Sequence, residues 1–200
     1  EQMGVTLMTN NTIITIGRQF GSGGHEIAEA LAEKLHLEIF DKKRFVEEAK
    51  KRNVYDENAN FLNEKPIDSF LYSIAMSYGA TNPRDRYIDF VKELTEQENC
   101  IIIGRCADHV LKDDPNVLRL FFFAPKEDCI VRVMEHDGIT GRDAENKIEK
   151  IDKHRADYYK YYTGRDWYDA RNYDFCLDTT SMGYEKLVEV VKNFIEVYQS

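Results

Sequence analysis

Residues 14–27, with the sequence ITIGRQFGSGGHEI, decide the fold of this chain. The β-branched run TIITI, residues 12–16, predicts a buried strand that stops at Gly17. An amphipathic helix follows the glycine-rich turn, with its core face formed by Ile27, Ala28, Leu31, Ala32 and Leu35. Backbone N–H groups at a helix start, together with the helix dipole, favour an anion. We therefore expect phosphate groups to bind at this turn.

The turn itself supplies the predicted phosphate ligands. Glycine allows a ligand to approach the backbone closely, and four glycines lie between the strand and the helix. We expect the backbone N–H groups of Gly21, Ser22, Gly23 and Gly24 to cradle phosphates. His25 is either a weak phosphate donor or an ordinary helix-start residue. The alternative for the whole segment is a tight turn that only packs well.

The turn departs from the standard phosphate-binding motif, G-x-x-x-x-G-K-[ST]. That motif needs a lysine for the β- and γ-phosphates and a hydroxyl for Mg²⁺. Here Gly24 stands where the lysine belongs, and Arg18 stands at the opening glycine. We expect the Arg18 guanidinium to replace the lysine, because arginine is always charged and binds phosphate oxygens in a fork. The alternative is a surface arginine. The metal ligands are unknown, with the Ser22 hydroxyl as a guess.

The rest of the chain alternates strands with helices. Further strands are predicted at residues 38–40, 100–103, 118–123 and 174–178, and helices at 42–52, around 87–94, at 126–136, at 142–162 and at the end of the chain. Side chains predicted to face inward on two of these helices are Cys129, Ile130, Val133, Met134, Leu187, Val190, Val191, Phe194, Ile195 and Tyr198. This alternation predicts an α/β fold, a parallel sheet with helices on both faces.

Composition narrows the class of protein. The 200 residues are 42% hydrophobic and 32% charged, which predicts one globular domain over residues 1–200. The net charge of −9 argues against nucleic-acid binding, which needs a basic face. No apolar run reaches the roughly 20 residues needed to cross a bilayer, and the first ten residues do not resemble a signal peptide. The four cysteines lack paired spacing, so we expect a cytoplasmic protein without disulfides.

Six segments together carry a family resemblance. They are ITIGRQFGSGGHEIAEALAEKL, FDKKRF, IIIGRCADHVL, LRLFFFAP, IDKHRADYYKYYTGRDW and YDFCLDTT, which follow one another in order. The chain resembles the cytidylate-kinase-like family, a nucleoside monophosphate kinase branch of the P-loop NTPases. This resemblance implies a three-layer α/β/α fold with sheet order 2-3-1-4-5. It also implies a flap for the nucleoside monophosphate (NMP) near residues 53–83, a helical lid near 138–168, and ATP and Mg²⁺ as cofactors.

The resemblance also implies roles for individual residues on the acceptor side. Asp41, Lys42 and Arg44 match the region that meets the acceptor monophosphate, although Asp41 is equally well read as a helix cap. Arg105 matches the arginine of a GR pair that contacts the acceptor phosphate, with a buried ion pair as the alternative. The pair is flanked by Ile103 and Cys106, where true cytidylate kinases have acidic residues.

In the lid, Asp152 and Arg155 resemble a D-x-x-R motif whose arginine reaches the transferring phosphoryl group. Asp152 lies three residues earlier, close enough on a helix to orient that guanidinium. Arg142 is a further lid cation, and most lid cations are equally well explained as a solvated helix face. The lid aromatics either pack on the body or stack on a base; they are Tyr158, Tyr159, Tyr161, Tyr162, Trp167 and Tyr168.

These observations predict an ATP-dependent kinase of a small phosphorylated acceptor, a nucleoside monophosphate, with Arg18, Arg105 and Arg155 as its catalytic cations. The main alternative is a nucleotide-binding sensor or scaffold without turnover, favoured by Gly24, Ile103 and Cys106. A dinucleotide-dependent oxidoreductase fits less well, because the glycine spacing is wrong and only Asp41 stands as the distant acid. A homodimer is the default assembly if the protein is not a monomer.

Overall fold

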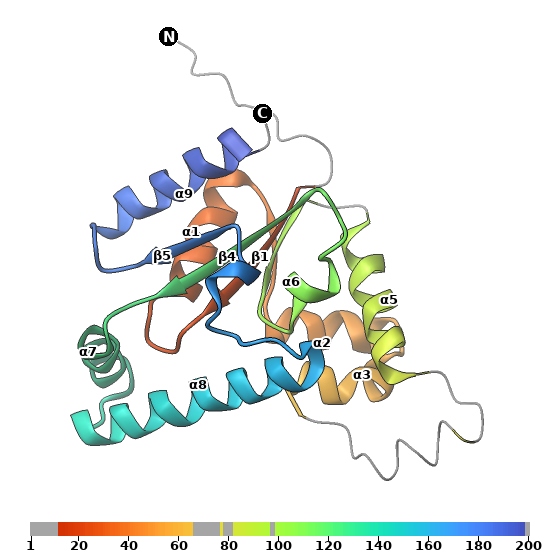
Figure 1. The fold of residues 1–200 in the computed structure, drawn as a ribbon, viewed down its shortest axis with the longest axis horizontal. Coiled ribbons are helices and arrows are strands. Elements are labelled where there is room, and N and C mark those ends of the chain that lie inside the picture. Colours follow the sequence, from red (N-terminus) through yellow and green to blue (C-terminus); the bar gives the residue numbers. More distant parts are fainter. Residues whose placement is uncertain (1–11, 66–76, 78–81, 97–98, 199–200) are drawn as a thin grey trace.

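The computed structural model describes residues 12–65, 77, 82–96 and 99–198. A parallel sheet with strand order β2-β3-β1-β4-β5 lies at its centre (Figure 1). The strands are β1 (Ile13–Arg18), β2 (Glu38–Phe40), β3 (Cys100–Ile103), β4 (Val117–Phe123) and β5 (Phe175–Asp178). The predicted sheet order is confirmed.

The central strand β1 is longer than the sequence predicts. It pairs with β3 up to Ile16 and continues along β4 until Arg18 lies beside Phe122. The prediction that Gly17 stops the strand is therefore wrong. Glycine is needed there for another reason, since a Cβ at Gly17 would lie 2.7 Å from a ring carbon of Phe121. The extra pairing brings Arg18 to the carboxyl edge of the sheet, where ligands bind in open α/β folds.

Helices cover both faces of the sheet. Helices α1 (Gly24–Leu35) and α9 (Tyr184–Tyr198) pack on one face (Figure 1). The other face carries α2 (Lys42–Lys51), α3 (Tyr55–Leu62), α5 (Pro83–Thr95), α6 (Ala107–Val110) and α8 (Gly141–Thr163). Alternate residues of β1 and β3 face the two layers: Ile14 and Ile101 contribute to the first core, and Ile13 and Ile102 to the second. The predicted three-layer α/β/α arrangement is confirmed.

Helix α7 (Lys126–Asp137) packs against α8 at one side of the sheet, through Cys129, Val133 and Ile148. Three side chains predicted to face inward are instead exposed: Met134, Val190 and Tyr198. Their helices each bury a narrow stripe, so residues at the border of the predicted face remain in solvent. The sequence also did not predict α6 or the short helix η1 (Ala170–Asn172), which are too short to show a helical period.

The predicted flap and the predicted lid differ in how much of each the structure describes. Within the predicted flap, α3 is described, whereas residues 66–76 and 78–81 lie outside the described part. The predicted lid contains α8, which begins after the N-cap Thr140 and ends before Gly164, with φ +72°. Of its aromatic side chains, Tyr158, Tyr159, Tyr162 and Trp167 are buried, whereas Tyr161 and Tyr168 are exposed.

No helix among the described residues has both the length and the apolar character to span a bilayer.

Candidate functional site

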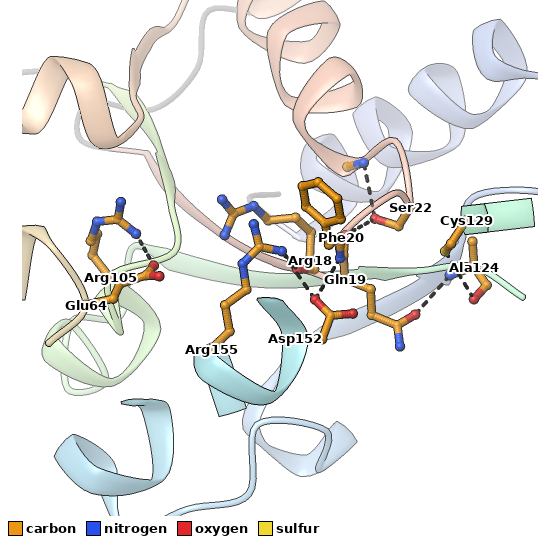
Figure 2. A network of polar contacts seen from close by, with 11 residues as sticks. Arg18, Gln19, Phe20, Ser22, Glu64, Arg105, Ala124, Cys129, Asp152 and Arg155 are labelled. Carbon is orange, nitrogen blue, oxygen red and sulfur yellow. Dashed lines mark hydrogen bonds and ion pairs between the residues drawn. The ribbon is translucent and has the colours of Figure 1, made fainter. Parts of the chain in front are cut away.

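The loop between β1 and α1 is held by the side chain of Ser22. This residue is fully buried, and its hydroxyl donates to the Gln19 carbonyl at 2.8 Å and accepts from the Gly24 amide at 3.3 Å (Figure 2). Gly21 and Gly23 both have φ of +78°, in the left-handed region that favours glycine. The Ser22 hydroxyl is already bonded on both sides and has no exposed surface, which argues against the guess that it binds a metal.

The loop presents backbone donors to a cleft. Within the described part of the chain, the amides of Gly23, His25 and Glu26 meet no acceptor, as expected for the first turn of a helix. All three residues line a cleft of about 420 Å³ between the loop, α7 and α8. Unpaired amides at a helix start attract anions, so the geometry supports a phosphate-binding loop. Of the four predicted amide donors, those of Ser22 and Gly24 are instead bonded within the loop, to the Gln19 carbonyl and the Ser22 hydroxyl.

Two residues that sequence reasoning missed brace the loop from behind. Arg132 of α7 donates to the carbonyls of Gly21 at 3.3 Å and Ser22 at 3.0 Å. The hydroxyl of Thr179, just after β5, donates to the same Ser22 carbonyl. These bonds hold the loop carbonyls on one side and leave the amides for a ligand. No local signal in the sequence pointed to either residue, because Arg132 and Thr179 lie 110 and 157 positions from Ser22.

The side chain of Arg18 packs against Gly24, the position where the standard motif has its lysine. A Cβ on Gly24 would lie 2.7 Å from the Arg18 Cβ and 3.2 Å from its Cγ. At its other end, Arg18 Nη1 lies 3.0 Å from the position of a Cβ on Gly104, directly after β3. Arg18 thus spans from the loop to the end of β3, which argues against an ordinary surface arginine. Burial, and the nearby charge of Arg155, lower the pKa of Arg18 to about 9, so it is protonated at neutral pH.

Asp152 and Arg155 join α8 to the loop. The Asp152 carboxylate accepts from the Phe20 amide at 2.8 Å and from Arg155 Nη1 at 3.4 Å, and Arg155 Nη1 also donates to the Arg18 carbonyl at 3.0 Å (Figure 2). The Arg155 guanidinium lies over the Phe20 ring, 5.7 Å from its centroid. Burial raises the pKa of Asp152 to about 6 and lowers the pKa of Arg155. The predicted D-x-x-R pair is therefore brought to the loop.

Arg105 lies at the end of β3 and is only 5% exposed. Its Nη1 donates to the carboxylate of Glu64, which follows α3 (Figure 2). The buried ion pair, the alternative weighed for this arginine, is thus present. Sequence reasoning missed Glu64, because it lies in a stretch without a clear pattern, 41 residues before Arg105.

Three guanidinium groups therefore gather at the carboxyl edge of the sheet, those of Arg18, Arg105 and Arg155. Arg18 and Arg155 lie next to each other between the loop and Arg105 (Figure 2). Their acidic neighbours are Glu64 and Asp152. A third carboxylate, Asp108, lines the small space beside Arg105, so the cations placed for a further anion are Arg18 and Arg155, which also line the cleft.

The remaining predicted residues lie apart from this cluster. Asp41 caps α2 by accepting from the Arg44 amide at 2.8 Å, which is its alternative role. Arg44 lies 3.9 Å from Glu38 and 3.7 Å from Glu48, and Lys42 is exposed. None of Asp41, Lys42 and Arg44 lines the cleft or the small space beside Arg105.

Two further predicted ligand-binding residues, His25 on α1 and Arg142 on α8, are not directed at the cluster. His25 lines the cleft, but its Nε2 faces Glu29 at 3.4 Å. Arg142 is exposed and lies thirteen positions before Arg155 on α8, about 20 Å along the helix. Lys147, from the same helix, lines the cleft instead.

The described residues do not form a metal site of their own. They contain no group of three or more His, Cys, Asp or Glu side chains placed to hold an ion. Asp137 lines the cleft, but it pairs with Lys147 at 2.8 Å, and this bond lowers the pKa of the carboxyl. The donor set therefore does not fit a magnesium ion held by protein ligands alone.

Known proteins with similar sequences or folds include kinases. A cytidylate kinase of Methanopyrus kandleri is 29% identical over 195 residues, covering 93% of this chain and 94% of that protein. A crystal structure of a protein from Eubacterium ventriosum has a TM-score of 0.71 at 30% identity, covering 92% of this chain and 98% of the other. A shikimate kinase from Acinetobacter baumannii, at 18% identity and a TM-score of 0.51 over 96% of each chain, shares the fold alone.

The family match agrees with the site. Residues 13–181, which run from the first residue of β1 to just beyond β5, match the model of the cytidylate kinase-like family. This span contains the loop, the three arginines and both carboxylates between them. This chain belongs to the cytidylate kinase-like family.

Proposed function

We propose that this chain transfers the γ-phosphoryl group of ATP to a small phosphorylated acceptor, with a nucleoside monophosphate as the first candidate. One observation supports the proposal: Arg18 packs against Gly24, the position of the lysine in the standard motif, and reaches Gly104 at the end of β3. The missing lysine was the feature of the sequence that argued against turnover. Arg18 supplies a positive charge beside that position.

The proposed mechanism rests on position and charge. The amides of Gly23, His25 and Glu26 bind the donor phosphates, and Arg18 lies over the transferring group. Arg105 faces the acceptor from the end of β3. Arg155, bonded to the Arg18 carbonyl, lies between the donor phosphates and the acceptor. Phosphoryl transfer needs little covalent help from the protein, so alignment of two substrates among fixed cations supplies most of the rate.

Magnesium has a limited place in this proposal. Among the residues that the structure describes, no group of side chains is placed to hold the metal. Mg²⁺ commonly keeps several waters and binds mainly through substrate phosphates. We therefore expect it to arrive with ATP rather than to occupy a site in the protein alone.

The test begins with calorimetric titration of ATP and Mg²⁺, then of a panel of nucleoside monophosphates, followed by product analysis of each mixture. Arg18→Ala is expected to lower turnover on the order of 10²- to 10³-fold, the cost of one preorganised donor. Arg171→Ala is the matched control, because Arg171 is exposed and pairs with Asp169 alone among the described residues. Transfer that is equally fast in Arg18→Ala would contradict the role given to Arg18.

A second candidate function is a nucleotide-binding sensor or scaffold without turnover. It is favoured by the buried ion pair of Arg105, which leaves the acceptor arginine already bonded. ATP binding without transfer to any acceptor would support this second function. The absence of ATP binding would remove both.

A further inference from the structure

We infer that Glu64 is a specificity-determining residue, whose carboxylate competes with the anionic group of the acceptor for Arg105. This inference rests on the proposed function in one respect: it takes Arg105 as the arginine that meets the acceptor. The competing ligand is a phosphate group carrying two negative charges, which can displace a carboxylate carrying one.

The Arg105 guanidinium is only partly satisfied. It is 5% exposed and donates to Glu64 through Nη1, while its Nε is buried and has no partner among the described residues. A buried donor without a partner destabilises the folded state. Arginine binds phosphate best through two parallel N–H groups, so the orphan Nε indicates that an oxygen-bearing ligand completes the site.

The space at Arg105 does not admit such a ligand while Glu64 stays in place. The cavity there measures about 20 Å³ and is lined by Arg18, Glu64, Gly104, Arg105, Arg155 and Trp167, among others. That volume holds about one water molecule. The side chain of Glu64 must therefore move before a phosphate group can reach Nε and Nη1 together.

The position of Glu64 suits a carboxylate that stands in for a ligand. Its Oε1 lies 3.9 Å from the position of a Cβ on Gly104, and Arg18 Nη1 lies 3.0 Å from the same point. Glu64 thus faces both Arg105 and Arg18, and its charge stabilises the protonated form of Arg18 and of Arg155. It follows α3 with φ of +53°, an unusual conformation for a residue with a side chain.

The experiment is a calorimetric titration of inorganic phosphate into wild type, Glu64→Gln and the matched control Glu57→Gln. Glutamine keeps the shape and an oxygen acceptor for Arg105 and removes the charge. Phosphate is expected to bind Glu64→Gln about tenfold more tightly than wild type. Glu57 pairs with Arg86 at 3.4 Å on a half-exposed surface, so Glu57→Gln is expected to leave phosphate affinity unchanged.

Two further variants locate the effect and guard against misfolding. In Glu64→Gln with Arg105→Gln, where the guanidinium is absent, the tenfold gain is expected to disappear; a gain that persists would place the phosphate elsewhere and overturn the inference. Glu64→Asp keeps the charge but shortens its reach, and it is expected to give an affinity between wild type and Glu64→Gln. If Glu64→Gln does not fold, the phosphate affinity of Glu64→Asp tests the inference: a gain over wild type supports it and no gain contradicts it.

Unchanged or weaker phosphate binding in the folded variants would overturn the role of Glu64, whether or not the chain is a kinase. Conversely, a gain in phosphate affinity without any transfer from ATP would support this role and count against the proposed function. The two ideas therefore fail separately.

Discussion

The two sides of the site differ in how ready they are for a ligand. The loop side is an open cleft of about 420 Å³ with unpaired amides, built from consecutive residues and held by Ser22. The acceptor side is a space of about 20 Å³, where Arg105 is bonded to the chain's own Glu64. A backbone loop keeps its donors in place without a ligand, whereas a side-chain site carries charges that must be compensated when the ligand is absent.

Arg18 contacts Gly24 on the loop side and Gly104 on the acceptor side. We therefore expect the largest effect on ATP binding from a substitution that displaces Arg18. Gly24→Lys installs the standard lysine, but its Cβ would lie 2.7 Å from the Arg18 Cβ, so we expect a distorted loop and ATP binding weakened at least on the order of tenfold. Combining it with Arg18→Gly removes the clash, and we expect ATP binding to recover. Calorimetry with ATP measures both. Normal ATP binding by Gly24→Lys alone would show that the loop side is more adaptable than its packing indicates.

Gly21→Ala tests the rigidity of the loop side. Gly21 has φ of +78°, and a Cβ there would lie 2.8 Å from the Cys129 carbonyl oxygen. Strain and overpacking together are expected to lower the free energy of unfolding by about 2–4 kcal/mol. Gly138→Ala is the control, because its φ is +66° but no atom lies within 4 Å of the added Cβ. Urea unfolding compares them, and equal losses would mean that the Cys129 contact contributes nothing.

The pH dependence of stability compares one carboxyl from each side. Burial raises the pKa of Asp152, at the loop, and of Asp108, near Arg105, to about 6 in each case, above the usual 3.8. Each group therefore adds stability that is fully present below pH 3.8 and is lost as the pH rises through 6.

Between pH 4 and 6 the free energy of unfolding of the wild type is expected to fall as these carboxyls ionise. In Asp152→Asn and in Asp108→Asn this fall is expected to be smaller by on the order of 1–3 kcal/mol. Urea unfolding at a series of pH values measures the slope. A slope that is unchanged in both variants would mean that neither carboxyl titrates in this window.

The smallest effect is expected at His25. Its imidazole faces Glu29 at the surface, at 3.4 Å, and the residue offers the ligand its backbone amide. We expect His25→Gln to change the free energy of unfolding by less than about 0.5 kcal/mol and to leave ATP affinity within a factor of two or so. A tenfold loss of ATP affinity would instead assign the side chain to the loop side as a phosphate donor.

The sequence predicted the loop side well because its parts are neighbours in the chain. Gly21, Ser22, Gly23 and Gly24 are consecutive, and the strand and helix around them have clear periods. The acceptor side was predicted poorly, since Arg105 and Glu64 are 41 residues apart and Glu64 lies where no period is visible. Asp41 shows that a local signal was read correctly, because its alternative role as the cap of α2 is present.

By itself, the sequence determined the order of strands and helices, the position of the phosphate loop and the absence of its lysine. These features depend on local hydrophobic periods and on glycine, which act between near neighbours in the chain. Only the tertiary structure decided that Arg18 reaches Gly104 at the end of β3, that Arg132 and Thr179 brace the loop, and that Glu64 pairs with Arg105. Each of these contacts joins segments far apart in sequence, and packing of helices against the sheet brings them together.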